Sequence, residues 1–347
     1  MMKYKIESSE KSTRAGLISE TKALLYLMGR HENGNEMYYF LVDVFNDVTG
    51  MDRLTKRLWD VQSKADKNVS PKQLGRFLVT LFKNYVSDFD FVDFILFVGG
   101  VSTGVRIDKI KNVFGIENIN TDAIEKIKDG LREEGRKKVY VDNNFLTDEN
   151  IDCFLRRLTI VVDPYKSPGE YVRLFVHSKK SQEIDTTLLE RIFLEISSTQ
   201  ASKRILQVIE GKELTRPFEA LQFCRDIKNK EIRMLILQRI MNCSFLDVGV
   251  PSHFVDVYSS WPDVVKDERL EECQQDLCRL VFDANNERAF WILFDRIYEV
   301  IEERTVSKVG EVYDILVNEY HDCLEHCTDM NCDLVMYFAS LIWKGMK

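Results

Sequence analysis

The stretch that decides the fold is residues 38–64, YYFLVDVFNDVTGMDRLTKRLWDVQSK. The aromatic and aliphatic run Met37 to Val44 is typical of a buried strand, and Leu54 to Lys64 is predicted to be the strand that pairs with it. A turn is expected between the two strands, over Asn46 to Met51, where Asn, Asp and Gly interrupt the apolar residues. This pairing brings the polar residues of both strands to one part of a sheet.

Five polar side chains belong to this part of the predicted sheet. Asp43 and Asp47 come at the end of the first strand and in the turn, and Gln62, Ser63 and Lys64 end the second strand. Because successive side chains of a strand point to opposite faces, Gln62 and Lys64 are expected on one side about 6.6 Å apart, with Ser63 on the other. A carboxylate, an amide oxygen and an ammonium group are thus expected to converge on one metal-bound phosphate.

These groups are suited to the cleavage of a phosphodiester. That reaction needs hard oxygen ligands for Mg²⁺ and a positive group near the attacking water and the phosphate. Asp47 and the side-chain oxygen of Gln62 are candidate metal ligands, and Lys64 is a candidate for orienting the water and stabilising the developing charge. The alternative is structural, with Gln62 bonded to the backbone and the Lys64 ammonium extended to solvent.

A helix is predicted before this stretch, over residues 12–28. Its apolar side chains recur every three or four residues, as in a buried stripe: Leu17, Thr21, Leu24, Leu25 and Met28. Glu20 lies one turn before Leu24, at the edge of that stripe. It is either a solvated helix residue or an acid that faces the site.

A second helix is predicted after the stretch, beginning at Ser70-Pro71-Lys72-Gln73. Ser is a favoured N-cap, Pro suits the first helical position, and Gln follows the cap by three residues. The helix separates an apolar side from a basic side that carries Lys72, Arg76 and Lys83. The basic side is either solvated or binds the backbone of a nucleic acid.

The remaining pattern divides the chain into two predicted domains. Residues 89–98 form a continuous apolar run that ends at Gly99-Gly100, and 158–162 is another β-like run, with helical stretches at 121–136 and 148–157. After residue 165 the apolar spacing is mostly helical, over 168–178, 185–203, 216–228, 231–242, 267–285, 287–304, 307–321 and 331–344. The prediction is an α/β domain over 1–165 and an all-α domain over 166–347.

Charge is distributed unevenly between the two parts of this chain of 347 residues with a net charge of -8. Residues 1–160 hold 25 Lys and Arg against 24 Asp and Glu, which leaves 23 against 32 for the rest. A polyanion is therefore expected to meet the N-terminal part, and the helical part is expected to meet protein. The absence of a long uncharged apolar run predicts no membrane span and a cytoplasmic location, and the eight dispersed cysteines are expected to be reduced.

The order of these elements resembles the PD-(D/E)XK nuclease superfamily, with Gln62 in place of the usual acid before x-Lys. The chain more narrowly resembles the double-stranded DNA endonuclease domain of bacterial anti-phage effectors in the CBASS and Lamassu systems, over residues 10–225. Further matching segments are 146–160 and 188–202. The resemblance implies a restriction-endonuclease-like α/β domain, catalysis with Mg²⁺ (or Mn²⁺), a core of Asp47, Gln62 and Lys64, and Asp43 and Glu20 as less constant acids. The family commonly has Glu where Asp43 stands.

The resemblance also carries expectations about assembly and activation. About 120 helical residues follow residue 225, fewer than the nucleotide sensor of a CBASS effector needs, so a Lamassu-type nuclease subunit fits better. The resemblance then implies an SMC-like ATPase and a small accessory subunit that hold the nuclease inactive, and release into a homo-oligomer that cuts DNA. The alternatives are a non-catalytic interaction subunit that keeps the nuclease fold, and a nuclease that acts on RNA.

Two further motifs are assigned structural roles. His321, Cys323, His326, Cys327 and Cys332 have ligand-like spacings but lack the paired Cys-x2-Cys knuckles of a zinc site, which favours a helix core and its terminal turn. Residues 99–104, GGVSTG, lack the Gly-Lys-Ser/Thr ending of a phosphate-binding loop and are expected to be a turn after a strand.

Overall fold

The computed structural model describes residues 3–7, 13–177, 184–242, 249–282, 287–325 and 330–346. The chain forms two compact units, one of Met1–Tyr171 with Phe193–Asn229, and a second of Val172–Ile192 with Lys230–Lys347. The chain therefore crosses between the units three times, whereas the sequence predicted one crossing near residue 165. Residues 193–229 return to the first unit because they supply its last strands.

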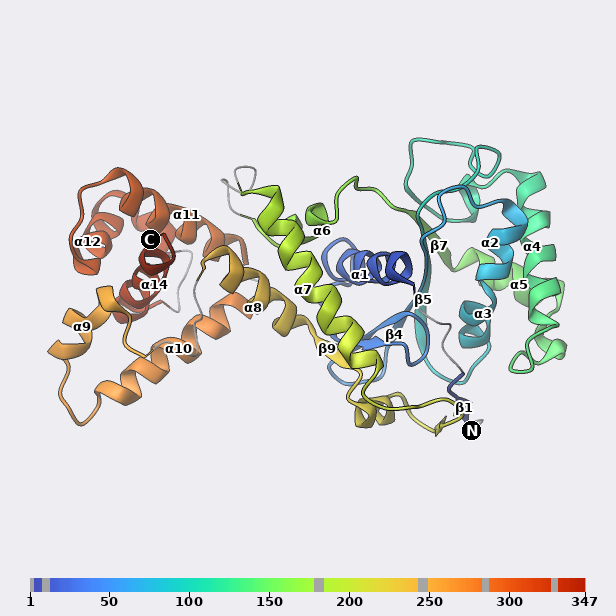
Figure 1. The fold of residues 1–347 in the computed structure, drawn as a ribbon, viewed down its shortest axis with the longest axis horizontal. Coiled ribbons are helices and arrows are strands. Elements are labelled where there is room, and N and C mark those ends of the chain that lie inside the picture. Colours follow the sequence, from blue (N-terminus) through green and yellow to red (C-terminus); the bar gives the residue numbers. More distant parts are fainter. Residues whose placement is uncertain are drawn as a thin grey trace. The chain divides into compact units, whose positions relative to one another are not determined.

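A seven-stranded mixed sheet is the centre of the first unit (Figure 1). Its strands lie in the order β6-β7-β5-β4-β3-β2-β9, with bounds β2 Met37–Val42, β3 Val48–Asp52, β4 Leu58–Lys64, β5 Phe91–Val98, β6 Val113–Phe114, β7 Leu158–Val162 and β9 Asp226–Lys228. The strands β4, β5 and β7 are parallel, and the other neighbouring pairs are antiparallel. This confirms a mixed α/β N-terminal part that is followed by a helical region.

The strand β3 corrects the prediction for the opening stretch. A turn was expected over Asn46 to Met51, but Val48–Asp52 is a strand that pairs with β2 on one side and with β4 on the other. The sequence pattern did not indicate this strand because it contains Gly50, and glycine is depleted in strands. A Cβ atom at residue 50 would lie 2.5 Å from Sδ of Met37, so a larger residue there would require the Met37 side chain to move.

Helices cover both faces of the sheet. Figure 1 shows α1 (Arg14–Gly29) on one face, and α2 (Pro71–Phe77), α3 (Val79–Tyr85), α4 (Thr121–Gly135) and α5 (Asp148–Arg156) on the other. The helix α1 begins at the N-cap Thr13, whose side chain accepts a hydrogen bond from Gly16 N at 3.1 Å. It is buried from Ser19 to Thr21 and from Ala23 to Met28, so it is enclosed rather than amphipathic.

The other face of the sheet is closed by a continuous apolar core. Its fully buried members include Leu74, Leu81, Phe82, Phe94 and Phe154, and each such side chain contributes about 2 kcal/mol through removal from water. The helices α2 and α4 lie in backbone contact, because a Cβ on Gly75 would be 2.0 Å from Ile127 O and one on Gly130 would be 2.1 Å from Lys72 O. The predicted helix from residue 70 is in fact two helices that meet at Leu78.

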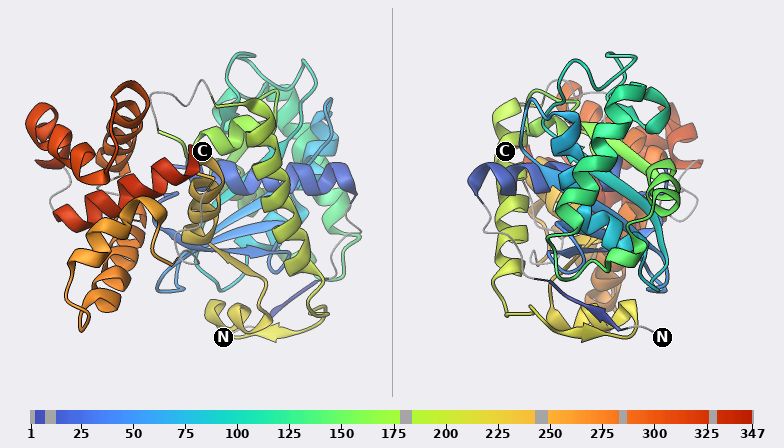
Figure 2. Two further views of the ribbon diagram at one scale, coloured as in Figure 1. Left: turned by 60° about the vertical axis from the view of Figure 1, so that its left-hand side comes forward. Right: turned by 90° about the vertical axis from the view of Figure 1, so that its right-hand side faces the viewer.

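Residues after α5 complete the first unit. They include the start of α6 (Gly169–Arg173), the end of α7 (Thr186–Arg204), β8 (Glu213–Leu214) and the 3-10 helix η4 (Pro217–Phe223). The strand β8 pairs with β1 (Tyr4–Lys5) beside η4, close to the N-terminus in Figure 2. A helix was predicted over 216–228, which is wrong, since η4 ends at Cys224 with φ 54° and the chain continues as β9 at the edge of the sheet.

The second unit is helical. It contains η5 (Ser252–Phe254) and helices α8 (Asn229–Ile240), α9 (Val255–Ser260), α10 (Lys266–Phe282), α11 (Glu287–Glu303), α12 (Val309–Glu319), α13 (His321–Glu325) and α14 (Cys332–Gly345). The helix α14 is its centre, because every residue from Tyr337 to Ile342 is buried and α10, α11, α12 and η5 all contact it. Within the described ranges, no helix combines the length and apolar character that crossing a membrane requires.

The cysteines of the described residues are free thiols, at Cys153, Cys224, Cys273, Cys278, Cys323 and Cys332. Cys243 lies outside the described residues, and so do His326 and Cys327, two of the five members of the predicted His and Cys cluster. Burial raises the pKa of the Cys273 thiol to about 12, which makes it a core residue rather than a nucleophile.

Candidate functional site

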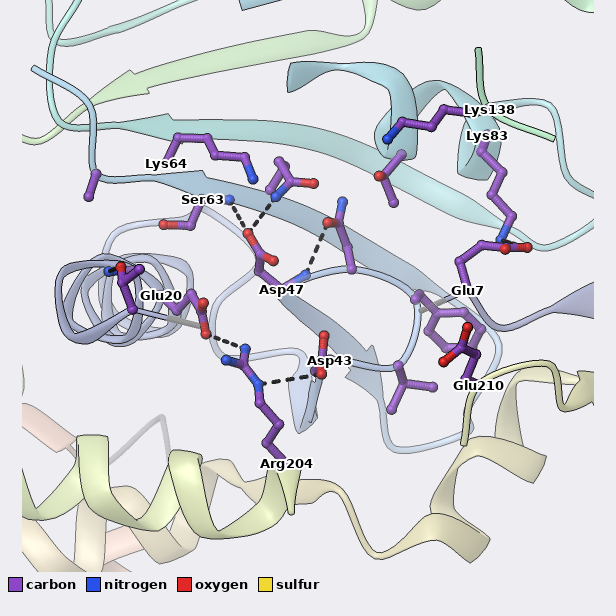
Figure 3. Close-up of a pocket in the computed structure, with 18 of the residues that line it drawn as sticks. Glu7, Glu20, Asp43, Asp47, Ser63, Lys64, Lys83, Lys138, Arg204 and Glu210 are labelled. Carbon is purple, nitrogen blue, oxygen red and sulfur yellow. Dashed lines mark hydrogen bonds and ion pairs between the residues drawn. The ribbon is translucent and has the colours of Figure 1, made fainter. Parts of the chain in front are cut away.

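A polar cavity of about 540 Å³ lies in the first unit, at the edge of the sheet where β2 and β4 end. The start of α1, the turn after β2, the end of β4 and the last residue of α7 contribute to its wall. The cavity brings together the five predicted site residues with one that was not predicted: Glu20, Asp43, Asp47, Gln62, Lys64 and Arg204. Figure 3 shows the acidic residues Glu20, Asp43 and Asp47 toward one end, and Lys83, Lys138, Glu7 and Glu210 toward the other.

The turn from Asp43 to Asp47 carries two of the acids. The strand β2 was predicted to extend to Val44, but it ends at Val42, and Asp43 adopts a left-handed φ of 56°. Asp43 N then donates to Asp47 O at 3.2 Å, and Asp47 N donates to the side-chain oxygen of Asn46 at 3.0 Å. Asp and Asn tolerate the left-handed region and close turns with their own backbone, so the polar residues of this turn explain its shape.

Asp47 is bonded directly to the end of β4. Its Oδ2 accepts from Ser63 N at 2.7 Å and from Gln62 Nε2 at 2.6 Å. The register of the two strands explains this contact. Val48, the first residue of β3, is opposite Val61 of β4, so Asp47, which precedes Val48, meets the last residues of β4. Lys64 lines the same cavity, with Nζ 5.6 Å from the centre of the Phe77 ring, and Figure 3 shows its ammonium directed toward Asp47.

Glu20 and Asp43 share a single guanidinium group. Arg204 donates from Nη2 to Glu20 Oε2 at 2.5 Å, and its Nε lies 3.4 Å from Asp43 Oδ2. Arg225 also donates to Asp43, from Nη1 to the main-chain O at 3.0 Å and to Oδ2 at 3.3 Å. Glu20 is buried and faces the cavity, so of the two predictions for this residue the inward orientation is the one the structure has.

A buried hydroxyl pair holds α1 against β4 next to the acids. Ser19 Oγ and Ser63 Oγ lie 2.7 Å apart, and both residues are buried. Ser63 therefore uses its backbone N–H for Asp47 and its side chain for α1. The predicted alternation of faces along β4 accounts for this division.

Two of the acids hold their protons unusually tightly. Burial raises the pKa of Glu20 to about 7, assisted by repulsion from Asp47 and Asp43 and opposed by Arg204. Burial likewise raises the pKa of Asp47 to about 6, opposed by Lys64 and by the Ser63 N–H. Buried acids with raised pKa values in a cavity are typical of functional sites, because a charged ligand or a proton must relieve their mutual repulsion.

A third buried acid lies behind the cavity and was given no role by the sequence. Asp60 is wholly buried and accepts from Asn84 Nδ2 at 2.6 Å, Thr49 Oγ1 at 3.1 Å and Asn46 Nδ2 at 3.3 Å. Asn84 also accepts from Tyr4 OH at 2.7 Å and donates to Phe45 O at 3.2 Å. This network fixes the turn that presents Asp47. A charged residue inside the apolar run Leu58 to Val61 is the signal that could have indicated it.

The three predicted nucleic-acid-binding residues do not form one exposed row. Lys72 and Arg76 are on α2, and both pair with Glu133 of α4, at 2.5 and 3.4 Å. Lys83 is on α3, where its Nζ donates to Lys5 O at 2.6 Å and lies 3.4 Å from Glu7 Oε1. Its side chain is 11% exposed and burial lowers its pKa to about 8. The prediction of a solvated position is wrong for Lys83, because β1 covers this part of α3.

The donors around the cavity fit a hard cation. Mg²⁺ binds through one or two carboxylates and keeps several waters, and Asp47, Glu20 and Asp43 supply oxygen donors here. Among the described residues, however, no three His, Cys, Asp or Glu side chains are grouped closely enough to hold a metal ion by themselves. Gln62 presents its nitrogen to Asp47, so its oxygen could join Asp47 as a ligand only after the amide turns by half a rotation.

Arg204 is the site residue that no sequence pattern indicated. It ends a helix far along the chain, 184 residues from Glu20 and beyond the predicted domain boundary. No local pattern marks it, since an Arg at a helix C-terminus is an ordinary stabilising residue. No protein-family model, curated protein or solved structure matches this chain.

Proposed function

We propose that this protein is a nuclease that depends on a divalent cation and cuts DNA at the cavity of the first unit. The observation that carries the proposal is the convergence of the Asp47 carboxylate and the Lys64 ammonium on one polar cavity at the end of β4. The resemblance of 43–64 to the PD-(D/E)XK pattern supports the same reaction. A seven-stranded mixed sheet with helices on both faces supports a restriction-endonuclease-like fold for this unit.

The residues of the cavity have separable roles in this proposal. Asp47 would hold Mg²⁺ or Mn²⁺, with Gln62 as a further ligand once its amide has turned, and Glu20 and Asp43 as supporting acids. A bound cation would polarise the phosphate and lower the pKa of an attached water. Lys64 orients the attacking water and offsets charge that develops on the phosphate oxygens. The Ser63 N–H holds Asp47 in position throughout.

The substrate is proposed to lie along the edge of the sheet where β4 and β5 end. Lys67 follows β4, and Lys109 and Lys111 belong to the loop after β5, which starts at the same edge because the two strands are parallel. All three are exposed and have no ion pair within the described parts of the chain. Lys72 and Arg76 remain candidate phosphate contacts, although Glu133 competes for both. Each phosphate contact makes binding more dependent on salt.

The biological setting follows from the resemblance alone. We infer a cytoplasmic effector of a bacterial anti-phage or anti-plasmid defence system of the Lamassu type. An SMC-like ATPase and a small accessory subunit would hold it inactive, and the released protein would self-associate, because cutting both strands of DNA needs two sites. The helical second unit is the proposed docking surface for these partners.

A direct test compares purified protein with its Lys64→Ala variant on plasmid DNA in the presence of excess Mg²⁺ or Mn²⁺. The variant is expected to lose at least about 100-fold in cutting rate, the scale for one group that stabilises developing charge. Lys56→Ala is the matched control, because Lys56 is exposed and lies just before the start of β4, whereas Lys64 is the last residue of that strand. Equal cutting by Lys64→Ala and Lys56→Ala would refute the role of Lys64.

A second function is favoured by one specific observation. Gln62 already donates a hydrogen bond to Asp47, and Arg204 already pairs with both Glu20 and Asp43. A non-catalytic subunit that keeps the fold as a scaffold would have such internally paired groups. The test is cutting by the complex assembled with its partner subunits, on DNA and on RNA in parallel. No cutting of either would favour the scaffold, and cutting of RNA alone would change the substrate.

A further inference from the structure

The acidic end of the cavity is compensated by a residue from a distant part of the chain. Glu20 and Asp43 have side chains only 8% and 11% exposed, and Arg204 between them is 16% exposed. Buried carboxylates require a positive partner or a proton, because removing a charge from water costs several kcal/mol. In this structure the guanidinium group of Arg204 supplies that partner, and Figure 3 shows it between Glu20 and Asp43.

Arg204 differs from Arg225, which also contacts Asp43. Arg225 donates to two main-chain carbonyl oxygens, of Asp43 at 3.0 Å and of Gln207 at 2.7 Å. It therefore ties two segments of backbone together. The contacts of Arg204 are to carboxylates, of Glu20 and Asp43, and its Nε is buried without a hydrogen bond. Removal of Arg204 breaks no link between backbone segments, whereas removal of Arg225 does.

The position of Arg204 in the chain leaves it room to move. It is the last residue of α7, and the segment that follows is neither helix nor strand. Ile205 and Val208 in that segment are each 82% exposed, and Leu206 is 56% exposed. The side chains of residues 205, 206 and 208 are therefore not packed, and the chain is next held where Arg225 bonds Gln207 O and where Ile209 is buried. A guanidinium group also keeps its charge at any physiological pH. A cation can therefore replace it at the acids only if the Arg204 side chain moves away from them.

We propose that Arg204 is an internal counter-ion that occupies the acidic end of the cavity and is displaced when a divalent cation binds there. This rests on the proposed function, since it concerns the cation of the same site. Arg204 then sets the cation concentration at which the site fills. Only molecules in which the Arg204 side chain has left the acids can bind the cation, so the apparent affinity falls in proportion to the fraction of such molecules. Any partner that moves the end of α7 changes that fraction.

The test is calorimetric titration of the full chain with Mn²⁺ alone, without DNA. Arg204→Gln replaces the guanidinium group with a shorter, uncharged polar side chain, and the variant is expected to bind Mn²⁺ at least about ten-fold more tightly than the natural protein. Arg132→Gln is the matched control, because Arg132 also pairs with two carboxylates, those of Asp129 and Asp148, and does not line the cavity. Unchanged or weaker binding by Arg204→Gln would overturn the proposal.

Thermal unfolding supplies a second readout. In EDTA, Arg204→Gln is expected to melt below the natural protein, and Mn²⁺ should restore its Tm by more than it raises that of the natural protein. Arg225→Gln should melt lower with and without Mn²⁺, because its backbone links are lost in both conditions. A deficit in Arg204→Gln that Mn²⁺ does not relieve would mean that Arg204 is only a structural residue.

The outcome separates this proposal from the proposed function. Tighter Mn²⁺ binding by Arg204→Gln together with no cutting of DNA by any form would leave the exchange standing and remove the nuclease. Cutting by the natural protein, together with an unchanged Mn²⁺ affinity in Arg204→Gln, would support the nuclease and overturn the exchange. Absence of Mn²⁺ binding in both proteins overturns the exchange.

Discussion

Asp47 and Asp60 are two acids of the same three-stranded part of the sheet, and they have opposite surroundings. Burial raises the pKa of both, to about 6 for Asp47 and about 7 for Asp60. Asp60 accepts from three side chains, those of Asn84, Asn46 and Thr49, and is completely enclosed. Asp47 accepts from one side chain and one backbone N–H, and it lines an open cavity.

The difference teaches how to separate a structural acid from a reactive one. A raised pKa is common to both and distinguishes neither. The number of fixed donors and the access to a cavity do distinguish them, since a fully satisfied carboxylate has no capacity for a ligand, whereas Asp47 lies where a ligand can reach it. Asp60 is expected to govern stability and Asp47 to govern activity.

Removal of each carboxylate is the strongest way to break this comparison. Asp60→Ala leaves two amide groups and a hydroxyl without their acceptor in the core, so the free energy of unfolding should fall by about 3 kcal/mol. Asp47→Ala should cost about 1 kcal/mol, because water in the cavity can replace the lost acceptor. Urea unfolding measures both changes.

Cutting of plasmid should show the reverse order. Asp47→Ala is expected to abolish it, by a factor of at least about 100, whereas Asp60→Ala should retain most of the rate per folded molecule. Asn143→Ala, at an exposed position on the same unit, is the control for both measurements. A larger loss of stability in Asp47→Ala than in Asp60→Ala would reverse the assignment.

The dependence of stability on pH gives the next largest effect. The folded-state pKa of Asp60 is raised from 3.8 to about 7, so between these values the folded protein holds a proton that the unfolded chain has released. Its contribution to stability is therefore fully present below pH 4 and is lost as pH rises to about 7, a change on the order of 2–4 kcal/mol. Asp60→Asn removes this titration.

The measurement is urea unfolding of the natural protein and of Asp60→Asn at pH 5 and pH 8. The free energy of unfolding of the natural protein, relative to the variant, should be smaller at pH 8. Parallel pH profiles for the two proteins would mean that Asp60 is ionised in the folded state across the whole range.

The sequence predicted which residues share the cavity better than it predicted the fold around them. Asp47, Gln62 and Lys64 could be placed because they are near one another in the sequence and a strand alternates its faces. Strand β3 was missed because Gly50 interrupts its pattern, and in the fold this glycine packs closely against the Met37 side chain. The orientation of the Gln62 amide could not be predicted either. It depends on the group that faces the amide, which in this structure is the Asp47 carboxylate.

Long-range contacts account for the rest of what the sequence could not show. Arg204 reaches the site from beyond the predicted domain boundary, and β9 joins the sheet from residue 226 onward. Lys83 is covered by β1, which lies 78 residues earlier in the chain at Lys5. Helical and strand periods report which face of an element is buried, and they do not report which distant segment covers it.

The network around Asp60 can be sharpened through Asn84. Its side chain links Tyr4 OH, Phe45 O and Asp60, and all three contacts are buried. Asn84→Ala should lower the free energy of unfolding by about 2 kcal/mol, because it leaves these groups unpaired. The variant should also cut DNA more slowly, since Phe45 belongs to the turn that presents Asp47. Unfolding in urea and the cutting rate are measured on one preparation, and an unchanged stability would remove Asn84 from the network.

The smallest effect concerns the serine pair that joins α1 to β4 beside Asp47. Ser19→Ala and Ser63→Ala should each lower the free energy of unfolding by about 1 kcal/mol, because each leaves one buried hydroxyl without its 2.7 Å partner. The double variant should cost less than the sum of the two, since no hydroxyl then remains unpaired. Ser63→Ala keeps the backbone N–H that bonds Asp47, so its cutting rate should stay close to that of the natural protein. Additive losses in the double variant would show that the two hydroxyl groups are satisfied independently, and that the contact between them does not hold α1 at the site.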